Sequence, residues 1–133
     1  MKNLTKKEMK RNENIARDIL AFLKENGYWF DIIIYFNNKA WSTSKKWKGE
    51  YGKIISEPIS DNFEIIEGVY EYENKNPLNY LEYANCDTIS ISFEGPIYKY
   101  LNYMDSEAFQ KVLDKHNAYY ELGHAWNLSI YFN

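Results

Sequence analysis

The N-terminal part of the chain has a helical hydrophobic period. One apolar stripe comprises Ile15, Ala16, Ile19, Leu20 and Leu23. Thr5 and Glu8 have the spacing of a capping box, in which each side chain bonds a free backbone amide of the first turn. Asn26 and Gly27 follow as a stop signal. The pattern predicts a helix over residues 6 to 25.

The next segment changes to alternation. One apolar face at period two comprises Tyr28, Phe30, Ile32, Ile34 and Phe36. This spacing predicts a central strand over residues 28 to 36. Asn37 and Asn38 tolerate positive φ, so we expect a turn there and a returning strand from Ala40.

Three later segments have the pattern of strands. "KIISE" at 53 to 57 is a short strand that Pro58 ends, and "FEIIEGVYEYE" at 63 to 73 is a strand with a bulge at Gly68. "TISISF" at 88 to 93 alternates polar with apolar residues and predicts a half-buried strand. Its inward face comprises Ile89, Ile91 and Phe93.

Short helices are expected between these strands. Asn76 and Pro77 have the residue types of a helix start for a helix within 76 to 85. Pro96 begins a second helix that runs to about Tyr103. Asp105 or Ser106 caps a third. Its inward residues are Phe109, Val112 and Leu113.

The C-terminus predicts a β-hairpin. "AYYEL" and "AWNLSIYF" flank Gly123-His124, which suits a two-residue type II′ turn. The expected core face of the hairpin comprises Trp126, Leu128, Ile130 and Phe132. Together the elements predict an α+β fold with a mixed or mainly antiparallel sheet of about five to six strands. The long N-terminal helix packs on one face.

Composition and charge add the next constraints. The chain of 133 residues is 45% hydrophobic and 18% aromatic, which suits one domain over residues 1–133. Residues 1–50 contain 11 Lys/Arg and 6 Asp/Glu, whereas residues 51–133 contain 5 and 13. The halves have opposite net charge, so they either neutralise each other on packing or offer two faces to different partners.

Cysteine usage and hydropathy indicate the compartment. Cys86 is the only cysteine, so no intrachain disulfide or cysteine-based zinc site can form. The N-terminus lacks the apolar run of a secretory signal, and the longest apolar run, residues 28 to 36, is too short to span a bilayer. We expect a soluble, cytoplasmic protein with no membrane partner.

Candidate catalytic groups are few. Cys86, His116 and His124 are the minimum parts of a thiol enzyme, but their spacing singles out no such site, and the histidines have no zinc spacing. There is no glycine-rich phosphate loop or serine-centred elbow. We expect no catalytic site, no cofactor and no metal, and we retain a small enzyme of unknown class as the second alternative.

The segment "KAWSTSKKWKGEYGK", residues 39 to 53, is rich in lysine and aromatic residues. Lysines neutralise phosphates and rings stack on unpaired bases, a combination suited to single-stranded nucleic acid. The alternative is a sheet edge whose tryptophans face the core and whose lysines block edge pairing. The candidate binding residues are Trp41, Lys45, Lys46, Trp47, Lys48, Tyr51 and Lys53.

The acidic half suggests a second kind of surface. Carboxylates alternate with rings around residues 63 to 82, and Glu67, Glu71, Glu73 and Glu82 are candidates to meet a basic protein surface. A plainly solvated face is the alternative. In size and charge the chain broadly resembles small acidic phage and mobile-element proteins that inhibit host defences, without a shared motif. We therefore expect a non-enzymatic bacterial or phage accessory protein that binds a protein, with single-stranded nucleic acid as the alternative partner.

Overall fold

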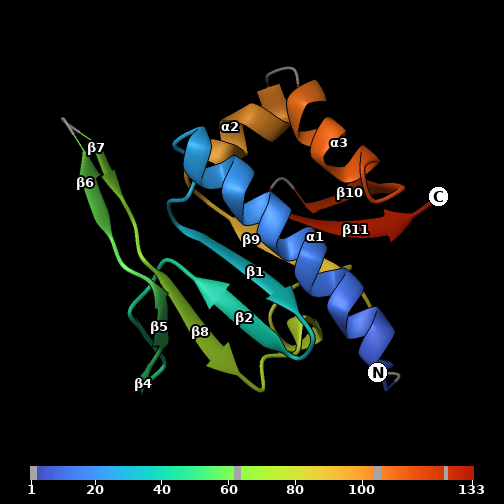
Figure 1. Ribbon diagram of the computed structural model, residues 1–133, viewed down its shortest axis with the longest axis horizontal. Helices are drawn as coiled ribbons and strands as arrows, with labels where there is room; N and C mark the ends of the chain where they lie inside the picture. The colour runs from blue at the N-terminus through green and yellow to red at the C-terminus, as the bar shows by residue number, and fades with distance from the viewer. Residues whose placement is uncertain (1–2, 62–63, 104–105, 125) are drawn as a thin grey trace.

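The computed structural model describes residues 3–61, 64–103, 106–124 and 126–133 (Figure 1). Seven strands form the main sheet: β1 (Ile32–Phe36), β2 (Lys39–Ser42), β5 (Lys53–Ser56), β8 (Val69–Glu73), β9 (Ile89–Phe93), β10 (Ala118–His124) and β11 (Asn127–Phe132). Their order is β10-β11-β9-β1-β2-β8-β5, and every neighbouring pair is antiparallel. The predicted α+β class with a mainly antiparallel sheet is confirmed, with more strands than expected.

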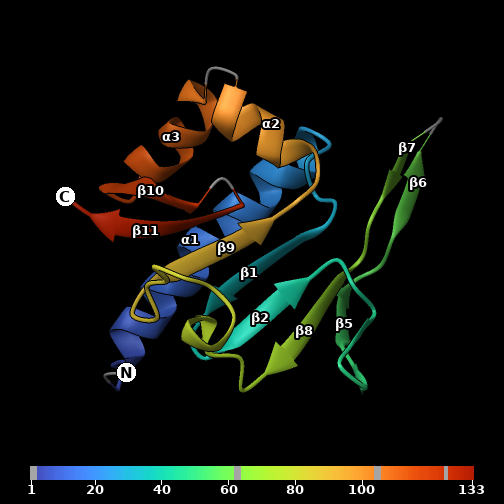
Figure 2. The same cartoon turned by 180° about the vertical axis from the view of Figure 1, so that it is seen from behind.

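Four short strands form two separate ribbons. β3 (Lys46–Trp47) pairs with β4 (Glu50–Tyr51), and β6 (Ile59–Asp61) pairs with β7 (Glu64–Ile66). The β6–β7 ribbon extends away from the β5 edge of the main sheet (Figures 1 and 2). The prediction of one bulged strand over residues 63 to 73 is therefore wrong. The chain leaves the ribbon after Ile66 and joins the main sheet only at Val69.

The N-terminal helix α1 (Lys6–Glu25) begins and ends as predicted. The Glu8 amide donates to Thr5 Oγ1 and the Thr5 amide donates to Glu8 Oε1, both at 3.1 Å, which completes the capping box. Asn26 is the C-cap, and Gly27 follows with a φ of 71°. The helix crosses one face of the sheet and buries its apolar stripe there (Figure 1).

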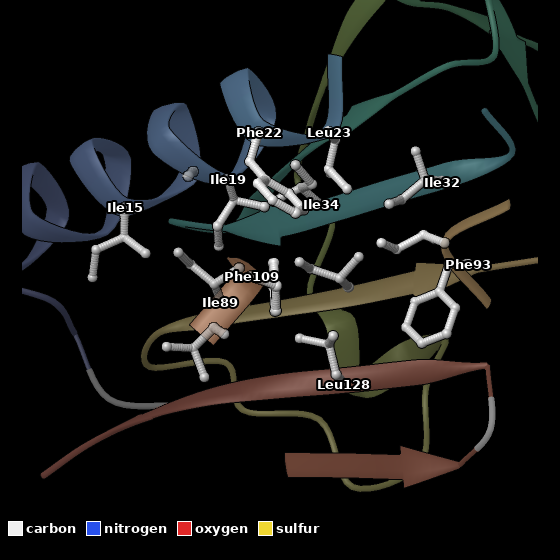
Figure 3. Close-up of a cluster of buried hydrophobic side chains, with 14 of the residues drawn as sticks. Ile15, Ile19, Phe22, Leu23, Ile32, Ile34, Ile89, Phe93, Phe109 and Leu128 are labelled. Atoms are coloured by element: carbon white, nitrogen blue, oxygen red, sulfur yellow. The ribbon is translucent and has the colours of Figure 1, made fainter. Parts of the chain in front are cut away.

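Two short helices, α2 (Pro96–Tyr103) and α3 (Glu107–Asp114), match the predicted pair. Phe109 and Leu113 of α3 are buried beside α1, whereas Val112 is half-buried. Ser106 stands at the N-cap of α3 but makes no capping hydrogen bond, and Asp105 lies outside the described residues. Figure 3 shows how α1, α3 and the strands β1, β9 and β11 meet in one apolar core.

Two predictions made for the segments around the main sheet need correction. β1 begins at Ile32 and not at residue 28, because Asp31 has a φ of 50° that breaks the extended backbone. Phe30, expected in the core, is 47% exposed. The expected helix over residues 76 to 85 is reduced to the 3₁₀ helix η1 (Pro77–Asn79), although the Asn76 side chain does cap it at the Leu78 amide.

The C-terminal hairpin exists, but its turn lies later than predicted. His124 is paired with Asn127, so Gly123 and His124 belong to β10 and form no type II′ turn. Leu128 and Ile130 are buried as expected, and Phe132 is half-buried against the core. Trp126, predicted as a core residue, is 56% exposed. Trp126 keeps the alternation of Leu128 and Ile130, but it precedes the first residue of β11 and lies beyond the end of the core.

Candidate functional site

The face of the sheet that points away from α1 has mostly small, polar or tyrosine side chains. It comprises Ile33, Tyr35, Ala40, Ser42, Tyr70, Tyr72, Ser90, Ser92, Asn127 and Ser129. Figure 2 looks onto this second face, where η1 and the loop after it run in front of the strands. A loop and a short hairpin cover this face in place of a long helix, and of its residues Ile33 and Ser92 are half-buried while the others are buried.

Hydrogen bonds between buried polar groups hold the covering loop in place. The Ser90 and Ser129 hydroxyl oxygens are 2.8 Å apart, and the Asn85 amide donates to Ser90 Oγ over 2.8 Å. Ser129 Oγ donates to the Tyr83 carbonyl at 3.3 Å. A buried hydroxyl without a partner is destabilising, so these bonds fix the path of the loop across the sheet.

An aromatic cluster lies beside the loop. The Trp47 ring centroid is 5.1 Å from that of Tyr80, 5.3 Å from Tyr72 and 6.1 Å from Tyr35. Tyr80 also stacks on Tyr35 at 5.8 Å. Burial raises the pKa of Tyr35 far above its ordinary range, which leaves its phenol neutral. The cluster therefore packs the loop and the β3–β4 hairpin together on the sheet.

A buried lysine fastens the β3–β4 hairpin to the body. Lys75 Nζ lies 2.6 Å from Glu50 Oε2 and 5.1 Å from the Trp47 ring centroid. The Tyr72 hydroxyl donates to the Ser44 carbonyl at 2.6 Å. These contacts hold the start of the hairpin, Thr43 and Ser44, at the edge of an open cleft.

The cleft has a volume of about 850 Å³ and lies over the ends of β1, β9 and β11. Its lining residues are Asp31, Ile32, Ile33, Thr43, Ser44, Tyr80, Leu81, Glu82, Ser92, Phe93, Glu94, Trp126 and Asn127. Three of them are acidic. Among the described residues that line it, none is a lysine, an arginine or a histidine. The cleft is thus an acidic depression with serine and asparagine beside aromatic rings.

Two of the cleft carboxylates stand opposite each other. Ile32 pairs with Phe93, so the next positions along β1 and β9 are Asp31 and Glu94, and the Glu94 amide donates to the Asp31 carbonyl at 3.1 Å. Like charges directly opposite on neighbouring strands are destabilising. Within the described part of the chain, neither carboxylate has a salt bridge with a basic side chain. The cleft thus holds two like charges on neighbouring residues, and no described basic side chain forms a salt bridge with either.

Glycine makes this close approach possible. A Cβ on Gly95 would lie 2.3 Å from the Phe30 carbonyl oxygen, which is a backbone atom and cannot move independently. Any side chain at position 95 would therefore push the segment before β1 away from the segment after β9. Gly95 lets the chain bring Asp31 and Glu94 to the same end of the cleft.

Trp126 supplies an exposed ring to the same site. Its backbone carbonyl accepts a hydrogen bond from the Phe93 amide at 2.8 Å, which places it opposite Phe93, the residue before Glu94, and both Trp126 and Glu94 line the cleft. The Tyr98 ring contacts the indole edge-on, with the centroids 6.4 Å apart. The indole is therefore held from one side and is still 56% exposed. Exposed tryptophan next to carboxylates is suited to binding a cation.

The residues of the predicted basic-aromatic site lie on different faces. Trp41 is buried on the α1 side and donates from Nε1 to Glu71 Oε1 at 3.0 Å, whereas Trp47 belongs to the cluster on the second face. Tyr51 is 72% exposed, and Lys46 Nζ lies 5.3 Å from its ring centroid. The remaining candidates, Lys45, Lys48 and Lys53, are exposed. The hairpin thus presents lysines and one exposed ring, without the tryptophan pair.

The four predicted acidic residues do not share one surface either. Glu71 faces the α1 side, where Lys39 Nζ lies 3.2 Å from Oε1. Burial disfavours the Glu71 carboxylate, but the hydrogen bonds from Trp41 and Lys39 outweigh this effect and lower its pKa. Glu73 is exposed on the same side of β8, and Glu67 is half-buried between β7 and β8. Only Glu82 lines the cleft.

The candidate catalytic groups have separate surroundings. His116 Nε2 lies 2.6 Å from Asp18 Oδ2 and joins α3 to α1. Cys86 Sγ is 3.9 Å from Asp87 Oδ1 in the loop before β9. The side chain of His124 is not among those described. Over residues 3–61, 64–103, 106–124 and 126–133, no group of histidine, cysteine and carboxylate residues is arranged to hold a metal ion.

Comparisons with known proteins give no match from which the role of the site could be inferred. No protein-family model, no curated protein and no solved structure matches the chain. In the described residues, no helix has the length and apolar character to cross a membrane. Sequence reasoning found Glu82 but missed Asp31, Glu94 and Trp126. The polar face Thr88, Ser90 and Ser92 of the predicted strand was the available signal that this side of the sheet is not a hydrophobic core.

Proposed function

We propose that this protein is a non-enzymatic bacterial or phage accessory protein that binds a basic segment of another protein in the acidic cleft. The observation that carries the proposal is the pairing of Asp31 with Glu94. The fold joins these two acidic residues by a backbone hydrogen bond just beyond the ends of β1 and β9 and places both in one cleft, whose described lining holds no basic side chain. A bound cation would complement their charges.

The shape of the cleft favours a protein segment as the ligand. The cleft is open, and serine, asparagine and backbone groups along it can bond to a polypeptide backbone. Trp126 supplies the type of exposed aromatic anchor that contributes most at protein interfaces. Hydrogen bonds through Ser90 and Ser129 hold the loop that contains Glu82 in place before any ligand binds. Binding therefore costs little conformational entropy in this loop.

The test is a pair of charge-matched double variants. Tagged wild type and variants would be used to capture proteins from a lysate of cells that express the chain. Asp31→Asn with Glu94→Gln should lose the captured partner, whereas Glu57→Gln with Glu121→Gln, which neutralises two exposed carboxylates outside the cleft, should retain it. The wild-type interaction should weaken with added salt. A partner that both variants retain at wild-type level would overturn the proposal.

Single-stranded nucleic acid is a second candidate partner, bound at the β3–β4 hairpin. The observation that favours it is the exposed Tyr51 ring among Lys45, Lys46 and Lys48. Lysines neutralise phosphates, and Tyr51 provides one stacking platform. The site is small, because Trp41 is buried and Trp47 is packed against the body.

Fluorescence anisotropy with a labelled oligothymidine tests this second candidate. Replacing the three lysines with alanine should weaken binding and reduce the salt slope by about 0.7 for each phosphate that is no longer neutralised. Tyr51→Ala should weaken binding at every salt concentration, whereas Tyr83→Ala, which removes another exposed ring, should not. Absence of binding by the wild type at low salt would leave the hairpin as a lysine-protected edge.

A further inference from the structure

Two tryptophans of this protein share a local arrangement with a carboxylate and a cation. Trp41 stands opposite Glu71 across β2 and β8, and its indole donates to that carboxylate at 3.0 Å. Lys39 Nζ is 3.2 Å from the same carboxylate. The Arg17 guanidinium carbon lies 5.5 Å from the Trp41 ring centroid. The chain thus supplies its own cations to this tryptophan and glutamate.

The same arrangement recurs on the second face of the sheet. Trp47 stands opposite Glu50 across β3 and β4. Lys75 Nζ satisfies both groups at once, at 2.6 Å from the Glu50 carboxylate and 5.1 Å from the Trp47 ring centroid. Although it carries a charge, Lys75 is 8% exposed. An aromatic face next to a carboxylate is an environment in which an ammonium or guanidinium group is well stabilised.

The cleft contains the aromatic ring and the carboxylates of this arrangement, but no cation. Trp126, Asp31 and Glu94 all line the cleft, and backbone hydrogen bonds join Phe93 to Trp126 and Glu94 to Asp31. In the described part of the chain, no lysine or arginine lies over the Trp126 ring or in the cleft lining. The missing component is a positive charge, which none of the described residues provides to the cleft.

We infer that the cleft takes an arginine side chain of the partner protein, stacked on Trp126 and bonded to Asp31 and Glu94. The inference rests on the proposed function and deepens it, because it names the anchoring residue of the basic segment. Charge complementarity between an arginine and the acidic lining selects this occupant.

Arginine suits the cleft better than lysine for two physical reasons. Its planar guanidinium has five donors in a fork and can bond two carboxylates at once, whereas the lysine ammonium is a compact point charge. The guanidinium is also less strongly hydrated and stacks on an indole face while its edge bonds outward. With Asp31 and Glu94 at adjacent strand ends and Trp126 beside them, both features can be used together.

The inference is tested by NMR titration of the ¹⁵N-labelled chain with three capped amino acids. The probes are Nα-acetylarginine amide, Nα-acetyllysine amide and Nα-acetylcitrulline amide, the last a neutral isostere of arginine. The arginine probe should shift the Trp126 indole and the Ser92 and Asn127 amides in a saturable way. The lysine probe should bind about two- to fivefold more weakly, and citrulline should cause no saturable shift.

Variants separate the contributions of stacking and charge. Trp126→Ala should abolish the preference for arginine over lysine, Trp126→Phe should retain most of it, and Leu78→Ala, which removes an exposed apolar side chain outside the cleft, should change nothing. Asp31→Asn with Glu94→Gln should weaken both cationic probes by about tenfold or more. Equal binding of arginine and lysine by the wild type would overturn the arginine assignment but leave a basic partner. Absence of saturable cleft shifts with every probe would overturn the inference, while the capture experiment decides the proposed function separately.

Discussion

The two faces of the sheet accommodate charge in opposite ways. On the α1 face, Glu71 is largely buried and is matched by the Trp41 indole and the Lys39 ammonium. On the second face, Asp31 and Glu94 stand opposite each other at the end of the cleft, without a described counter-charge. On the α1 face the carboxylate is neutralised by a lysine of the chain itself. On the second face, we infer, the carboxylates are neutralised only by a bound partner.

This difference separates stability from recognition in the molecule. The α1 face contains most of the large, fully buried side chains, so it provides most of the hydrophobic stabilisation (Figure 3). The second face has serine and tyrosine positions covered by a loop and a hairpin. Binding sites commonly tolerate arrangements that are unfavourable in the free protein. Substitutions on the two faces should therefore differ in their effects on unfolding.

The largest expected effect is that of Trp41→Ala on the α1 face. The ring is 1% exposed, contacts Phe36 edge-on with centroids 4.6 Å apart, and donates to Glu71. Its removal should lower the free energy of unfolding by about 3 to 5 kcal/mol. Urea denaturation measures the change.

Trp126→Ala is the matched control for this change. It deletes the same type of side chain from the lining of the cleft, where more than half of the ring is exposed. We expect a change within about 0.5 kcal/mol, as for most surface substitutions. Comparable losses for the two variants would show that the cleft ring is part of the folding core, and the contrast between the faces would be wrong.

Gly95→Ala should have the next largest effect. The added methyl group would lie 2.3 Å from the Phe30 carbonyl oxygen, and relief requires the two strand ends to separate. We expect a loss of about 1 to 3 kcal/mol, with changed amide shifts at Asp31 and Glu94. Gly123→Ala should cost less, because the atom closest to its added methyl group is the Asn127 side-chain oxygen at 2.4 Å, which can rotate. The reverse order would contradict the role assigned to Gly95.

Much of the α1 face could be predicted from sequence, because its elements are defined by local signals. The capping box at Thr5 and Glu8 marks the start of α1, and the alternation in "TISISF" identifies β9 together with its inward residues. In each case the periodicity of the apolar residues agrees with the tertiary burial. A segment can be predicted from sequence alone when its local sequence signals agree with its packing in the folded protein.

The second face could not be predicted to the same extent, because its features depend on breaks in periodicity. Asp31 looked like an alternating strand position, but it has a positive φ, precedes the first residue of β1 and lines the cleft. Trp126 has the alternation of the core face but precedes β11, so it is exposed beyond the end of the core. The opposition of Asp31 to Glu94 depends on the pairing of β1 with β9, and no local sequence signal encodes that pairing.

A smaller, pH-dependent effect should come from Glu71→Gln. The folded protein lowers the pKa of Glu71 despite burial, because Trp41 and Lys39 bond its ionised form. A lowered folded pKa contributes stability above the unfolded pKa, and this contribution is lost as the pH falls through the folded pKa. The variant should therefore be less stable than the wild type at neutral pH, and the gap should close in acid. A gap independent of pH, measured by thermal melts over an acidic series, would contradict the assignment.

The smallest expected effect has the opposite sign and concerns Glu94→Gln in the cleft. The substitution removes one of the three carboxylates that line the cleft and deletes no described salt bridge. The free energy of unfolding should rise by a few tenths of a kcal/mol, on the order of one cross-strand pair. Added salt should reduce the gain, because ions screen the repulsion in the wild type. Urea denaturation of the two proteins at low and high salt measures this difference, and Glu57→Gln serves as the control carboxylate. A destabilised Glu94→Gln would mean that Glu94 already has a stabilising partner within the chain, and the cleft would then have no need of an external cation.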